Sequence, residues 1–105
     1  MRELSVQKVA QVIVMSRELY RAEAELRDFV DAMSADEQAE LVAVMWVGRG
    51  SFDVSDFSEA VTTARQEATT PCADYLIGTP HLAENLEAGL EAMSYAVSEE
   101  ESTLY

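Results

Sequence analysis

The chain has 105 residues, of which 49% are hydrophobic and 26% are charged, as expected of one small globular domain. Twenty acidic and seven basic residues give a net charge of −13. This charge argues against a nucleic-acid binder and against adsorption to an anionic membrane, because both surfaces attract clustered Lys and Arg.

The single cysteine, Cys72, cannot form a disulfide within the chain. We therefore expect a fold held by its core in a reducing compartment, and predict a cytoplasmic protein. The apolar stretch 9–15 is interrupted by Gln11 and runs into a Ser-Arg-Glu sequence, unlike a signal peptide. The longest unbroken apolar run, residues 41–47, is far shorter than a membrane span requires.

Residues 5–33 are predicted to be helical, with Ser5 as the N-cap. No Gly or Pro interrupts them, and their apolar residues recur close to a heptad. Ser16 and Glu23 are the misfits in this apolar seam. We therefore expect either one bent or supercoiled helix or a break near residues 20–23.

Ser34 and Glu37 have the spacing of a capping box and predict a helix that ends at Gly48. The second half of this helix is apolar on every side, so residues 43–47 are expected to lie at the centre of the fold. Trp46 is predicted to be buried there, and its indole N–H then needs a hydrogen-bond partner, for which a nearby carbonyl would suffice.

Residues 53–68 predict the next helix, and Asp53 as its N-cap would place Phe52 and Phe57 in the arrangement of a hydrophobic staple. Two Thr-Pro pairs then each supply an N-cap hydroxyl and a proline for the first helical turn. The first pair predicts a short helix over 71–77, and the second predicts a longer helix over 80–95.

The last of these helices has two distinct faces. Its leucines and Gly89 fall in one sector, whereas Glu84, Glu87 and Glu91 lie opposite and are expected to form a solvated stripe. A glycine lowers helix propensity, so Gly89 is predicted to allow the close approach of another helix. We divide the chain into a helical domain, 1–97, and a mobile acidic tail, 98–105.

Acidic charge is concentrated after residue 33. Residues 1–33 carry five basic and six acidic side chains, whereas residues 34–105 carry two basic and fourteen acidic ones. Such a field would speed association with a basic protein and repel nucleic acid.

The sequence predicts no catalytic residue, no cofactor and no metal site. The Gly-Arg-Gly turn lacks the third glycine of a dinucleotide fingerprint, and one histidine among scattered carboxylates is a poor metal site. Trp46, Arg49, Tyr75 and His81 remain as candidate ligand-binding residues. The glycine-flanked turns and proline-fixed helix starts around them hold rigid polar groups on loops, where binding sites concentrate.

Residues 41–50 (LVAVMWVGRG) and 73–93 (ADYLIGTPHLAENLEAGLEAM) resemble an uncharacterised bacterial family, a domain of unknown function with a Trp-x-Gly-Arg-Gly element and a later Tyr-Leu-x-Gly-Thr-Pro element. The resemblance extends over residues 26–93. Ser51 departs from it, because the family tends to have an acidic residue there, and the chain lacks a long acidic insertion between its first helical segments. The resemblance implies an all-helical bacterial domain and no known activity.

Together these features predict an all-α fold, a small single-domain bundle of about five helices. We favour a non-enzymatic protein-interaction module, such as a homodimer formed through the N-terminal seam, which substituting Leu26 or Val30 by Asp should dissociate. The alternative is a small-ligand-binding domain or an enzyme that uses the region of Arg49, Tyr75 and His81.

Overall fold

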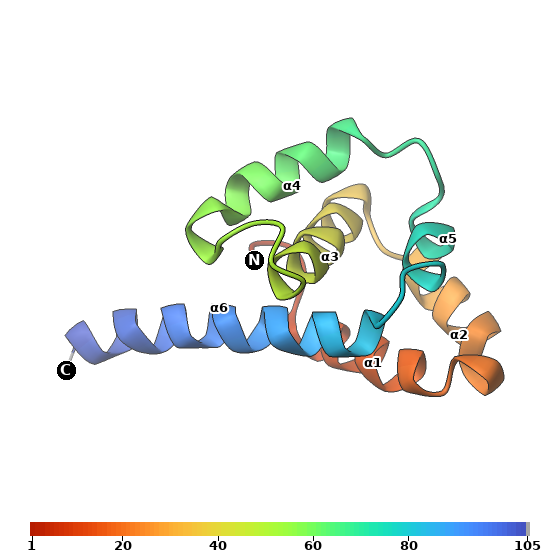
Figure 1. The fold of residues 1–105 in the computed structure, drawn as a ribbon, viewed down its shortest axis with the longest axis horizontal. Helices are drawn as coiled ribbons and strands as arrows, with labels where there is room; N and C mark the ends of the chain where they lie inside the picture. The colour runs from red at the N-terminus through yellow and green to blue at the C-terminus, as the bar shows by residue number, and fades with distance from the viewer. Residues whose placement is uncertain (105) are drawn as a thin grey trace.

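The computed structural model describes the backbone of residues 1–104 and the side chains of residues 1–94. Within these residues there are six α-helices, one 3₁₀ turn and no β-strand, so the predicted all-α bundle is confirmed. The elements are α1 (Val6–Arg17), α2 (Leu19–Asp31), α3 (Ala35–Gly48), the 3₁₀ turn η1 (Val54–Asp56), α4 (Phe57–Gln66), α5 (Cys72–Ile77) and α6 (Leu82–Leu104). Figure 1 shows the shorter helices gathered around α3, with the long α6 running past them.

Helix α3 lies at the centre of the fold, as predicted. Nine consecutive residues of α3, 39–47, are buried. The helix packs against α4, α5 and α6 (Figure 1). A helix surrounded by other helices needs apolar residues on every face, which is why residues 41–47 show no amphipathic period.

Helices α3 and α6 meet backbone to backbone at two glycines. A Cβ added to Gly89 would overlap the carbonyl oxygen of Val44, and a Cβ added to Gly48 would overlap that of Asn85. The helices reach this separation only because neither glycine has a side chain. The prediction for Gly89 is therefore confirmed, and Gly48 has the same role on the facing helix.

Helix α3 is terminated by Gly50, whereas Gly48 was predicted to end it. Gly48 is still helical, and Gly50 has a φ of 86°, which glycine adopts without steric cost. The Ser51 N–H donates to the Trp46 carbonyl (2.9 Å) and the Gly50 N–H donates to the Val47 carbonyl (3.1 Å). These are the two bonds of a Schellman motif, so the Gly-Arg-Gly sequence combines a helix crossing with a helix terminator.

The N-terminal helical stretch is broken at Glu18, just before the predicted zone of residues 20–23. Glu18 has φ −118° and ψ 42°, and its N–H bonds to the carbonyl three residues back. The Ser16 hydroxyl donates to the Ile13 carbonyl (2.8 Å), a bond that often bends helices. Beyond the break Glu23 is exposed, so this misfit in the seam lies in solvent rather than in the core.

The apolar seam of α1 and α2 is buried within the single chain. The seam residues Val9, Val12, Leu26 and Val30 are fully buried. Helix α1 packs against α2 and α6, and α2 also packs against α5. The seam side chains belong to this core and not to a surface that a second copy could reach. Substituting Leu26 by Asp therefore tests the core rather than an interface.

The two Thr-Pro pairs start their helices later than predicted. Pro71, not Thr70, is the N-cap of α5, and it forms no side-chain capping bond. The Thr79 hydroxyl donates to the Tyr75 carbonyl (2.7 Å) and so closes the end of α5, while α6 begins at Leu82. Each pair lies in a turn between helices instead of in the first turn of the helix that follows.

The predicted helix 53–68 is divided into η1 and the shorter α4. Asp53 precedes the 3₁₀ turn without a side-chain capping bond. The inner face of α4 consists of small residues, since Ala60 and Ala64 are its buried side chains. This face lets α4 pack closely on α3.

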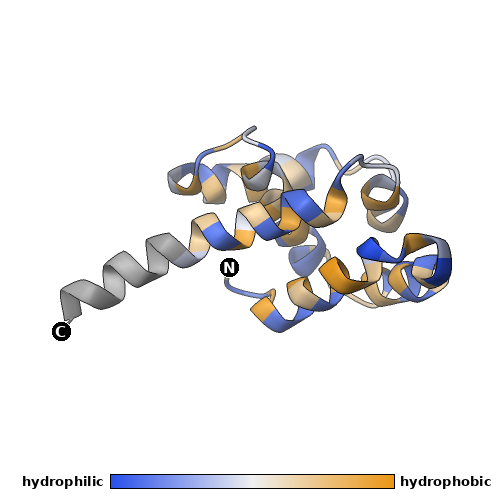
Figure 2. Ribbon diagram, turned by 60° about the horizontal axis from the view of Figure 1, so that its bottom comes forward, coloured by the Kyte–Doolittle hydropathy of each residue, from blue (hydrophilic) through white to orange (hydrophobic). Residues whose placement is uncertain are grey.

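Helix α6 has the predicted two faces, visible as alternating hydrophobic and hydrophilic residues in Figure 2. Leu82 and Leu86 are buried, and the three glutamates of the stripe are exposed. The helical backbone continues to Leu104, beyond the predicted end near residue 95. The predicted tail, 98–105, has its side chains outside the described residues, and its mobility remains a prediction.

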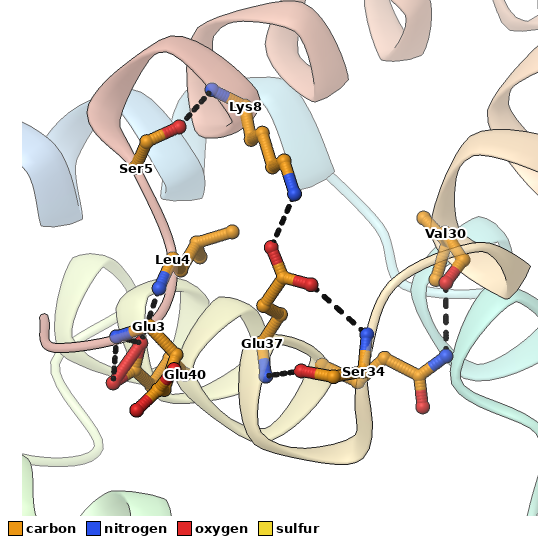
Figure 3. Close-up of polar contacts among 9 residues, drawn as sticks. Glu3, Leu4, Ser5, Lys8, Val30, Ser34, Glu37 and Glu40 are labelled. Carbon is orange, nitrogen blue, oxygen red and sulfur yellow. Dashed lines mark hydrogen bonds and ion pairs between the residues drawn. The ribbon is translucent and has the colours of Figure 1, made fainter.

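A capping box ties the start of α3 to both N-terminal helices. Ser34 and Glu37 form both of its bonds, as predicted. Glu37 also pairs with Lys8 of α1, and Gln38 donates to the Val30 carbonyl near the end of α2 at 2.9 Å (Figure 3). The Lys8 side chain and then the Ser34 N–H hold the pKa of Glu37 below its ordinary value.

A buried carboxylate pins the N-terminal segment to α3. Glu40 is only 5% exposed, and its two oxygens accept hydrogen bonds from the backbone N–H groups of Arg2, Glu3 and Leu4 at 2.8–3.2 Å. Figure 3 shows Glu40 beside Glu3 and Leu4. Burying a carboxylate is costly unless its oxygens are satisfied. The bonds therefore stabilise the buried charge and fix residues 2–4 at the same time.

Substituting Gly89 by Ala should destabilise the domain by about 2 kcal/mol or more, because α3 and α6 would have to separate. Gly78→Ala is the matched control. A Cβ there would meet only backbone atoms of its own helix, the nearest at 3.3 Å, and should change stability by about 0.5 kcal/mol or less. Urea unfolding followed by circular dichroism measures both. Wild-type stability of the Gly89→Ala protein would contradict the helix crossing.

Substituting Glu40 by Gln should lower the free energy of unfolding by about 1–3 kcal/mol, because one amide oxygen cannot replace two carboxylate oxygens. Hydrogen exchange at the amides of residues 2–4 should accelerate. Glu91→Gln, at an exposed site on α6, is the control and should leave both quantities unchanged. Unaltered exchange at residues 2–4 in Glu40→Gln would show that the carboxylate does not hold the segment.

Candidate functional site

A cavity of about 790 Å³ lies between α3, α4 and α5. Val42 and Trp46 of α3, the end of α4 with the loop that follows it, and Tyr75 of α5 form its walls. Residues 67–71, in that loop, are exposed, so the cavity opens to solvent. We call it the α3–α4–α5 groove.

Four of the fourteen residues that line the groove are alanines, whose short side chains leave space between the helices. Ala35 and Ala39 contribute from α3, and Ala64 and Ala68 contribute from the end of α4 and the following residues. Larger side chains at these positions would fill the space, as they do elsewhere in a close-packed interior. The α4–α5 loop passes over the open side without closing it.

Trp46 is held rigidly in the groove wall. Its indole N–H donates to the Tyr75 hydroxyl at 2.9 Å, which supplies the partner that the buried indole needs. Phe52 stacks on the indole with ring centroids 5.6 Å apart, although it was predicted to staple to Phe57. The Arg49 guanidinium lies 5.9 Å from the Trp46 ring centroid. The indole is 7% exposed, so the prediction that it is buried is confirmed.

Two charged side chains line the groove. Arg65 forms an ion pair with Asp36, on the first turn of α3. Glu67 lies on the rim, and its side chain forms none of the ion pairs or hydrogen bonds found among residues 1–94. The positive charge in the groove is therefore neutralised, and the negative charge is available to a ligand.

Cys72 faces the groove but is not activated as a nucleophile. Its side chain is partly buried, and its Sγ lies 3.9 Å from the Gln38 carbonyl oxygen. Burial, and secondarily the charge of Asp31, raises the pKa of the thiol to about 11. A nucleophilic cysteine needs the opposite shift, because the thiolate is the reactive form. Cys72 therefore acts as a packing residue.

Of the four predicted site residues, the groove contains two. Trp46 and Tyr75 line it and bond to each other. Arg49 lies over the Trp46 ring outside the cavity lining, and its Nε donates to the Ser51 hydroxyl at 2.9 Å. His81 lines a separate hollow of about 310 Å³ beside the α1–α2 break and does not join the other three.

His81 has a left-handed backbone, with a φ of 57°, and is the residue before the first turn of α6. Its carbonyl accepts the Asn85 N–H at 3.0 Å. Histidine is among the residues that tolerate this conformation better than most. The geometry explains His81 as a turn residue between α5 and α6.

Sequence reasoning did not identify the residues that open the groove. Ala68 and Thr69 lie after α4, in a stretch that was predicted to be helix followed by a connecting loop. Nothing in their local sequence indicates a cavity, because the space depends on where α4 and α5 pack on α3. The burial of Glu40 could have been predicted from the sequence. Glu40 lies on the same helix face as Val44 and Val47, which follow it by one and two turns of the buried helix.

Among the described side chains, no group of His, Cys, Asp and Glu has the arrangement of a metal site. The described helices include none that is both long and apolar enough to cross a membrane.

Residues 23–95 match the model of a family described as a protein of unknown function, DUF3775. The chain belongs to the DUF3775 family. The matched range includes α3, α4 and α5, and therefore every residue that lines the groove, whereas α1 lies outside it. No curated protein and no solved structure matches the chain.

The two sequence elements that suggested the resemblance meet in this DUF3775 protein at the Trp46–Tyr75 hydrogen bond. In the first element Gly48 permits the helix crossing and Gly50 ends α3. In the second, Thr79 closes α5 behind Tyr75. These residues build the groove wall and its support, so their positions have a structural explanation that requires no catalytic role.

Alkylation of Cys72 by iodoacetamide should be slow near pH 8 and should rise with pH up to about 11, following the raised pKa of the thiol. At pH 8 the rate should be about 100-fold below that of the urea-unfolded protein, because the thiolate fraction falls tenfold per pKa unit. Mass spectrometry of timed samples measures both rates. A native rate equal to the unfolded rate would contradict the burial of the thiol.

Proposed function

We propose that this protein is a non-enzymatic interaction module that binds an apolar segment of a partner protein in the α3–α4–α5 groove. The observation that carries the proposal is the groove itself, about 790 Å³ in volume, in which four alanines, Val42, Trp46 and Tyr75 make up half of the lining residues. This volume lies within the range of ligand-binding cavities, and helix-in-groove recognition uses apolar anchors in a cleft of this kind.

The polar groups around the groove favour a protein segment over a small polar substrate. The Trp46 indole N–H is already bonded, Arg65 is paired with Asp36, and the Cys72 thiol is held protonated. Small-molecule sites orient their ligands with several convergent polar groups. The neutral polar groups left in the lining are the hydroxyls of Thr69, Thr70 and Tyr75 and the amide oxygen of Gln38, and they can bond to the backbone of a bound peptide.

A second exposed apolar surface lies on α1. Val6 and Val14 are 60% and 63% exposed on the outer face of α1 and form a narrow apolar stripe. The groove is the better candidate for two reasons: it is concave, and it lies within the part of the chain that defines the family. Self-association remains a prediction, and the seam that suggested it is buried in the core.

We place this module in the bacterial cytoplasm. The single half-buried cysteine, with no second cysteine to pair with in the chain, supports a reducing compartment. The bacterial origin rests on the sequence resemblance described above.

A random library of 16-residue peptides displayed on phage, selected on the immobilised full-length protein, tests the proposal. Selected peptides should shift the emission of Trp46, which is the single tryptophan of the chain. The variant Ala68→Arg places a large side chain at the exposed rim of the groove and should weaken their binding at least tenfold. Ala10→Arg, exposed on α1, is the matched control and should bind as wild type.

Circular dichroism establishes that both variants remain helical. Peptides that bind wild type and Ala68→Arg equally would place the binding surface elsewhere. A reproducible small-molecule adduct in the native mass spectrum that Ala68→Arg displaces would replace the proposal with the small-ligand alternative.

A further inference from the structure

The electrostatic surroundings of the groove are negative. Glu67 lies on its rim, and Asp31 is close enough to Cys72 in its wall to act on the thiol by charge. Both carboxylates are on exposed residues. Glu67 forms no ion pair with another described residue, so it can interact with a bound partner. Asp31 instead lies within charge range of Arg27 on the same helix.

The cations near the groove leave Glu67 without a partner. Arg27 of α2 pairs with Asp74 of α5 and lies within charge range of Asp31. Arg65 is the one cation lining the groove among residues 1–94, and it is paired with Asp36. Arg49 lies over the Trp46 ring and donates to Ser51, away from the cavity lining. These two arginines are the only basic residues after residue 33, where fourteen residues are acidic.

We infer that the partner segment is a short amphipathic helix with a basic polar edge, whose apolar face enters the α3–α4–α5 groove and whose Lys or Arg side chains lie against Glu67. This inference rests on the proposed function and names its partner class. The groove supplies a contact surface for apolar anchors, and the unpaired carboxylate of Glu67 in its lining supplies the charge that selects a basic sequence. The −13 charge of the whole chain would also steer such a partner toward it.

The same charges argue against a second copy as the occupant. Two chains would each bring a net charge of −13 to the contact, and like charges opposed at an interface cost affinity. A basic partner instead gains from every acidic residue within a Debye length of about 10 Å.

Charge-reversal variants of the full-length protein test the inference on the peptides selected from the random 16-residue library. Glu67→Lys and Glu91→Lys change the net charge equally, but residue 67 lies on the groove and residue 91 on the exposed face of α6. Selected peptides should carry a net positive charge. Their Kd at low salt should rise about fivefold or more for Glu67→Lys, and by less for Glu91→Lys. Binding should weaken steadily as NaCl is raised from about 50 to 500 mM, because salt screens exposed charges.

The outcomes separate the inference from the proposed function. Peptides that need the groove, because Ala68→Arg blocks them, but that are neutral or acidic would overturn the inference and leave the proposed function standing. Equal effects of Glu67→Lys and Glu91→Lys would also overturn it, since the charge would then act only at long range. A selection that yields no peptide sensitive to Ala68→Arg would overturn the proposed function, and the inference with it.

Discussion

The close crossing of α3 and α6 is the constraint on which the rest of the fold depends. Gly48 and Gly89 let the two backbones meet where any side chain would overlap a carbonyl oxygen. This contact sets the depth of α3 in the bundle and so allows its second half to be buried on every side. It also fixes Trp46, half a turn before Gly48, in the position where its indole reaches Tyr75. The groove wall is therefore a consequence of the helix crossing.

The two halves of α3 organise the molecule by different physical means. The first half uses polar contacts: the capping box joins α1 through Lys8, Gln38 reaches the end of α2, and Glu40 holds the N-terminal segment (Figure 3). The second half uses close packing against α6 and α4. Polar bonds with defined geometry select one arrangement of the N-terminal helices, and the apolar packing supplies the larger part of the stability.

Much of the fold can be predicted from local chemistry. The capping box, the uniformly apolar α3 and the glycine on the inner face of α6 each identify a feature that the structure contains. The errors lie where neighbouring elements compete for one residue. Thr79 bonds backwards to α5 instead of capping α6, and Phe52 stacks on Trp46 of α3 instead of packing on Phe57. Such choices depend on tertiary packing, which a single sequence does not show.

The candidate site was predicted only in part, because it too depends on how the helices pack. Trp46 and Tyr75 have distinctive chemistry and were identified as candidates, and the structure joins them. His81 was grouped with them because it shares their turn-rich context, but the chain places it in another hollow. The alanines that leave the groove open have no distinctive local pattern, because a cavity is a property of the space between helices.

Binding in the groove is the central claim of this account, and NMR tests it most directly. Spectra of the ¹⁵N-labelled protein would be recorded with and without a peptide from the selection. Shifts confined to amides of residues 35–46 and 64–75, with a change at the Trp46 indole, are the predicted result. Shifts on the outer face of α1 around Val6 and Val14, with the groove unchanged, would contradict the account.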